Sequence, residues 1–161
     1  MTQTLGQLPA NHAHNTRKLA VIIEIAVAIL LVVFFYTGIA KLIDRLSFEV
    51  NLQQHSIFSG HAHLVSYAAP CLELAIATSL IFSKTRQAGL AASTLLMAFF
   101  TGYVIHLMLT LPHLPCSCGG AVGWLTWPQH IAFNVFLTGV AGTAFVLNRK
   151  LNRHRKILIA R

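Results

Sequence analysis

The sequence predicts an all-α integral membrane protein, folded as an antiparallel bundle of four transmembrane helices. Of its 161 residues, 55% are hydrophobic and 10% are charged, whereas soluble domains carry roughly 25% charged residues. Four apolar runs each approach the roughly 20 residues that a helix needs to cross the bilayer core. Short connections between the runs favour antiparallel neighbours, and the length suits a single domain.

The chain divides into two tails and a membrane domain between them. Residues 1–18 are polar, end at Arg17-Lys18 and are predicted to form a cytoplasmic N-terminal tail. The first apolar run is longer than a signal-peptide core of about 7 to 15 residues, which favours an uncleaved span. A membrane domain over residues 19–148 is predicted to hold spans at residues 19–40, 64–82, 88–111 and 129–147, and residues 149–161 a basic cytoplasmic tail.

The fourth span has a helix start signal. Thr126 and Gln129 have the Thr-x-x-Gln spacing of a capping box, and Pro128 between them is tolerated in a first turn. A helix is therefore expected to begin here.

Basic residues predict the sidedness. Arg17-Lys18, Lys84 with Arg86, and the C-terminal tail fall on one side, whereas the connection from residue 112 to 128 has no Lys or Arg. By the positive-inside rule, both termini are cytoplasmic and that connection faces outward. In a bacterium this is the oxidising side of the cytoplasmic membrane. The same clustering explains the net charge of +8 by topology and lipid headgroups, so no nucleic-acid partner is expected.

Cys116 and Cys118 form an outward-facing Cys-x-Cys pair. A disulfide between them would close a very small, strained ring, and strain makes a disulfide more oxidising. Gly119-Gly120 leaves room for an approaching thiol. A redox role is the favoured interpretation, while a static disulfide and a soft-metal site such as copper, using His113, Cys116, Cys118 and His130, stay open.

Two residues of the second span are candidates for chemistry. Cys71 follows Pro70 about 10 Å below the outer end. It is either a resolving thiol for the outer pair or a small buried residue beside a proline kink. Glu73 carries a carboxyl group in hydrocarbon, which must be protonated or paired. It is predicted to handle protons or contact a ligand, with a structural hydrogen bond to a neighbouring helix as the alternative.

Four polar residues of the last two spans are predicted to line one outer cavity. Tyr103 and His106 are three apart, and His130 and Asn134 are four apart, so each pair shares a helix face. The alternative for each is a satisfied hydrogen bond between helices.

Several strings together resemble the MauE/DoxX-like redox-associated membrane proteins, in the form common in Bacteroidetes. They are Pro115-Cys116-Ser117-Cys118-Gly119-Gly120, Leu125-x-Trp127-x-x-His130-x-x-x-Asn134, Tyr36-Thr37-Gly38-Ile39-Ala40-Lys41-Leu42 and Pro70-x-x-Glu73-Leu74. The resemblance runs from about residue 20 to residue 148. It implies a four-helix membrane protein linked to thiol-disulfide chemistry outside the cytoplasmic membrane, with a quinone as candidate electron acceptor.

The chain departs from well-understood membrane disulfide oxidases, which use Cys-x-x-Cys and a second, shuttling pair. Here there is one Cys-x-Cys and a lone Cys71. The leading hypothesis is therefore a thiol-disulfide redox component, an oxidoreductase or an accessory subunit of one, with a periplasmic thioredoxin-like or disulfide-containing partner. The alternatives are a non-catalytic subunit that anchors a periplasmic partner and a copper-binding membrane protein.

Overall fold

The fold is helical throughout the part of the chain that the structure, a computed structural model, describes: residues 10–55, 57–110 and 126–159. The elements are α1 (Ala10–Ile43), α2 (Arg45–His55), the short 3-10 helix η1 (Ser59–His61), α3 (Ala62–Ile81), α4 (Arg86–Thr110) and α5 (Trp127–Ile159). The all-α prediction is confirmed.

Four of the described helices are long and apolar enough to cross a membrane. These segments are Thr16–Ile43, Ser59–Ile81, Arg86–Thr110 and Pro128–Arg153. Helices α1 and α5 have 34 and 33 residues, which makes each about 50 Å long, against about 30 Å of hydrocarbon. Both therefore extend into the segments that the sequence assigns to the two tails.

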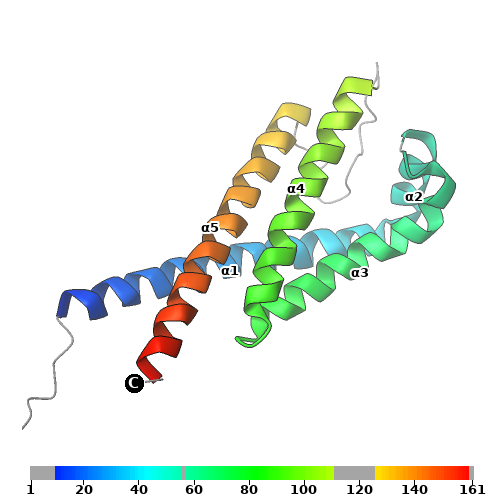
Figure 1. Cartoon of the computed structure of the whole chain (residues 1–161). Helices are drawn as coiled ribbons and strands as arrows, with labels where there is room; N and C mark the ends of the chain where they lie inside the picture. Colours follow the sequence, from blue (N-terminus) through cyan, green and yellow to red (C-terminus); the bar gives the residue numbers. More distant parts are fainter. Residues whose placement is uncertain (1–9, 56, 111–125, 160–161) are drawn as a thin grey trace, which may run out of the picture.

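The long helices form two antiparallel pairs, α1 with α3 and α4 with α5, and the pairs cross each other obliquely (Figure 1). Because the spans alternate in direction, the end of α1, the start of α3, the end of α4 and the start of α5 face one side of the membrane. We call this side the α2 end, since α2 lies there, and the opposite side the turn end, after the turn between α3 and α4. The sequence does not predict α2, which forms within the polar stretch between the first two spans.

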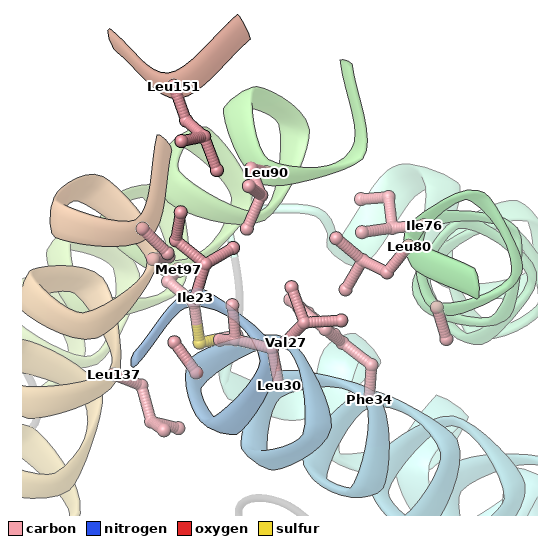
Figure 2. Close-up of a cluster of buried hydrophobic side chains, with 14 residues drawn as sticks. Ile23, Val27, Leu30, Phe34, Ile76, Leu80, Leu90, Met97, Leu137 and Leu151 are labelled. Atoms are coloured by element: carbon pink, nitrogen blue, oxygen red, sulfur yellow. The ribbon is translucent and has the colours of Figure 1, made fainter. Parts of the chain in front are cut away.

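The core lies where the two pairs cross (Figure 2). From α1, Ile23, Leu30 and Phe34 point into it, at the spacing of one helix face. Leu80 of α3 and Leu137 of α5 complete the contact from the other helices. The opposite faces carry exposed apolar side chains, as expected of a protein surrounded by lipid.

Two glycines allow helices to approach closely. At Gly89 of α4, an added Cβ would lie 2.4 Å from Ser79 Oγ and 3.1 Å from Leu80 Cδ2 of α3. At Gly38 of α1, an added Cβ would lie 3.1 Å from Leu74 Cγ of α3. Small residues at such points bring helix backbones together, as is common in membrane bundles.

Polar contacts mark both the start of α5 and the turn end. The Thr126 backbone N–H donates to Gln129 Oε1 at 3.0 Å, which is one half of the predicted capping box. The predicted start signal of the fourth span is therefore confirmed.

At the turn end, Arg86 Nη1 of α4 donates to Glu24 Oε1 of α1 at 2.5 Å.

Candidate functional site

A cavity of about 320 Å³ lies among the helices, toward the α2 end. All five α-helices contribute to its wall, together with Phe58 from the segment between α2 and η1. Its polar lining residues are Thr37, Lys41, Asn51, Glu73, Tyr103, His130 and Asn134, and the others are apolar. An apolar hollow with a few convergent polar groups is the usual form of a small-molecule site.

Glu73 is the most deeply buried polar residue of this cavity. Its side chain is fully buried on α3, its Oε1 accepts a hydrogen bond from Lys41 Nζ, and its Oε2 accepts one from Thr37 Oγ1 at 2.9 Å. Thr37 and Lys41 are four apart on α1, so one helix face satisfies both carboxylate oxygens. The sequence requires the Glu73 carboxyl group to be either protonated or paired, and the structure shows it paired.

The local sequence explains why this pair can form. Gly38 lies between Thr37 and Lys41, and its missing side chain leaves room for Leu74 and for the Pro70 carbonyl oxygen, 3.4 Å from where a Cβ would stand. The α1 and α3 segments quoted for the family resemblance are therefore in contact, and their polar residues meet across the helix interface.

Lys41 contributes its amino group to the cavity wall. Its side chain is 13% exposed, and its Nζ lies 4.9 Å from the ring centroid of Phe100 on α4, within cation-π range. Glu73 and Phe100 therefore hold the ammonium group at the cavity wall. The predicted first span ends at residue 40, so the sequence does not predict this role for Lys41, although its four-residue spacing from Thr37 is a usable signal.

The predicted site residues of the last two spans divide between the cavity and the exposed surface. Tyr103 of α4 and His130 and Asn134 of α5 line the cavity, and Asn134 is buried. His106 is exposed and is not among the lining residues. Tertiary structure therefore gathers Glu73, Tyr103, His130 and Asn134 in one place and leaves His106 outside it.

Of the three cysteines, only Cys71 is among the described residues, and it does not line the cavity. Cys71 is exposed on α3. Cys116 and Cys118, and with them His113 of the copper alternative, lie outside the described residues. The connection that holds them runs from the end of α4 at Thr110 to the start of α5 at Trp127, so it begins and ends at the α2 end. His130, only three residues into α5, lies near one of these attachment points.

Helix α2 covers the cavity with Phe48, Asn51 and Leu52. It is held to α3 through Glu49, which pairs with Arg45 on its own helix. Glu49 Oε1 also lies 3.2 Å from His63 Nδ1 of α3. Ser66 Oγ, which donates to the His63 carbonyl oxygen at 2.8 Å, lies 3.4 Å from Glu49 Oε2.

These contacts set the charge of Glu49. Burial by itself would raise the pKa of Glu49, but the hydrogen bond and charge of His63 and the charge of Arg45 outweigh it and lower the pKa below its ordinary value. Arg45 also stacks on Tyr67 of α3, with 4.6 Å between Cζ and the ring centroid. A charged Glu49 therefore helps to hold α2 over the cavity.

Comparison with known proteins adds a family to this geometry. Residues 19–147 match the family described as "Methylamine utilisation protein MauE". No curated protein and no solved structure matches the chain. The family match covers most of the sequence, including most of each membrane-spanning helix and every polar residue that lines the cavity. This chain, a multi-pass membrane protein, belongs to the MauE family.

Proposed function

We propose that this protein is a thiol-disulfide redox component of the bacterial cytoplasmic membrane. Cys116 and Cys118 cycle between dithiol and disulfide at the outer face, and the cavity binds a membrane-soluble electron carrier of the quinone class. One observation supports this most directly. The polar-lined cavity takes part of its wall from α4 and α5, the two helices that the Cys-x-Cys connection joins.

The chemistry of the cavity suits such a carrier. A bound quinone supplies an acceptor for two electrons and two protons, which is what a dithiol releases when it becomes a disulfide. The apolar wall solvates a ring and tail, while the Lys41 ammonium group stabilises negative charge that develops on an oxygen. His130 and Tyr103 line the same space and are the candidate proton donors and acceptors.

Glu73 acts in this proposal as a positioning residue. Both of its oxygens accept hydrogen bonds from α1, so its part is to hold Lys41 at the cavity wall. The missing second cysteine pair comes from a thioredoxin-like or disulfide-containing partner outside the membrane. Since the family is described as "Methylamine utilisation protein MauE", methylamine utilisation is the process that we propose this exchange serves.

Differential alkylation of the cysteines in native membranes tests the proposal. We expect Cys116 and Cys118 to resist a maleimide until a reductant is added, and to become resistant again when a quinone is supplied after the reductant is removed. A Cys71→Ser variant simplifies the labelling pattern. A Cys118→Ser variant is expected to trap a mixed disulfide between Cys116 and the partner.

The proposal would be wrong if both thiols had the same reactivity with and without reductant. It would also be wrong if reduced thiols in wild-type membranes stayed reduced when a quinone was present.

A further inference from the structure

Part of the cavity wall is exposed on the outside of the helix bundle. Leu72 of α3 and Phe99 of α4 both line it, yet their exposed fractions are 50% and 53%. Ala68, one helical turn from Leu72, also lines the cavity and is exposed. Leu72 and Phe99 lie near the middle of their helices, Ala62–Ile81 and Arg86–Thr110. The exposed part of the wall therefore lies at the depth of the hydrocarbon, between α3 and α4.

Contacts at two levels define the borders of this opening. Toward the turn end, α3 and α4 touch closely where Gly89 faces Ser79, and from there the two helices diverge (Figure 1). Toward the α2 end, Phe58 reaches across to α4, with ring centroids 6.3 Å from Phe99 and 5.9 Å from Tyr103. The opening lies between these two closures.

Within the described part of the chain, α2 covers the cavity on the side of the membrane surface. Its Leu52 is buried, and Phe48 and Leu52 both line the cavity. The Arg45 and Glu49 contacts hold α2 against α3 at this position. The side of the cavity toward water is therefore covered by α2, whereas the side toward lipid is exposed.

We propose that the ligand of this cavity enters sideways from the bilayer, through the opening between α3 and α4, and leaves its apolar tail there when bound. The proposal rests on the proposed function, since the ligand is the electron carrier. It adds the route of entry and the place of the tail for this carrier, a membrane-dissolved molecule with an oxygen-bearing head and a long apolar tail. The head meets Lys41 and His130, and the tail lies against Leu72 and Phe99.

Thiol oxidation in vesicles tests the route. The reduced full chain is placed in phosphatidylcholine vesicles that contain a long-tailed ubiquinone, and disulfide formation is followed by alkylation and mass spectrometry. Ala68→Trp narrows the opening and is expected to slow oxidation by the ubiquinone about tenfold. Leu95→Trp is the matched control, because Leu95 is 72% exposed on α4 and does not line the cavity.

Oxidised glutathione, which is water-soluble, provides the second arm. It is expected to oxidise the wild type and both variants at the same rate. If the ubiquinone oxidises the wild type and Ala68→Trp equally fast, the lateral route is wrong. If it oxidises neither the wild type nor the variants, the proposed function fails instead.

Photolabelling of the wild type gives a readout that does not depend on a variant folding. A ubiquinone analogue with a diazirine at the first isoprenoid unit of its tail is expected to label the peptides that contain Leu72 and Phe99. The label should appear whether or not the thiols are oxidised. Labelling confined to α2, or spread evenly over all lipid-facing helices, would overturn the proposal.

Discussion

At the scale of single residues, the Lys41 and Glu73 pair is the clearest departure from an apolar interior. An isolated carboxylate in hydrocarbon is strongly unfavourable, and pairing with complete hydrogen bonding makes it tolerable. Thr37 and Lys41 together satisfy both oxygens of Glu73. Removing one partner is therefore worse than removing both, because it leaves the other polar group without its partner.

The first prediction concerns this pair. Glu73→Gln is expected to destabilise the protein by roughly 3–5 kcal/mol, because the Lys41 ammonium loses its counter-charge. The double variant Lys41→Met with Glu73→Leu is expected to recover much of that loss. Thermal unfolding in detergent micelles measures both.

Glu24→Gln is the control, because Glu24 is 60% exposed in its pair with Arg86, and exposed pairs contribute about 1 kcal/mol or less. A Glu73→Gln variant as stable as Glu24→Gln would show that the ion pair does not contribute as argued.

At the scale of elements, close helix approach sets the α3–α4 hairpin. Gly89→Ala is predicted to destabilise it by about 1–3 kcal/mol, because the new methyl group would overlap Ser79 and Leu80. Gly102→Ala on the same helix has no heavy atom within 4 Å of the new Cβ. That control is expected to be neutral, or more stable by up to about 1 kcal/mol. Equal melting temperatures for the two variants would contradict the packing argument.

The attachment of α2 is predicted to depend on pH. The folded protein lowers the pKa of Glu49 below 4.5, its value without these contacts. The stabilisation is therefore fully present above pH 4.5 and is lost as the pH falls through the lower, folded value. A spin label on a cysteine at Gln54, which is exposed on α2, should gain mobility in that acidic range.

Glu49→Gln is expected to make this label mobile at neutral pH and to remove its response to acid. A label whose mobility is unchanged in Glu49→Gln at neutral pH would show that Glu49 does not hold the helix.

At the scale of the whole molecule, the basic residues predict which side each connection faces. In a background without native cysteines, Ser83→Cys is expected to react with a membrane-impermeant maleimide only after the cytoplasmic membrane is permeabilised. Ser59→Cys is expected to react from outside in intact cells. The two positions lie at opposite ends of α3, so labelling of both from one side would refute the four-span arrangement.

The sequence by itself determined the class of protein and the number and order of its spans. Hydrophobic runs long enough to cross a bilayer leave a helix as the main way to satisfy the backbone, and the capping signal at Thr126 marks where α5 begins. The sequence also marked Glu73 as a group in need of a partner, because its position within an apolar run places the carboxyl group in hydrocarbon.

Only the tertiary structure decided which partner Glu73 finds, which of Tyr103 and His106 faces the cavity, and where that cavity opens. Each of these depends on how far one helix is rotated against its neighbour and on where two helices diverge. Close contact at Gly38 and Gly89 sets the rotation of the helices and the point where they diverge. Neither can be read from a single segment, because each depends on two helices. The polar stretch that follows the first span becomes helix α2 for the same reason, because α3 and the cavity supply the surface on which Leu52 is buried.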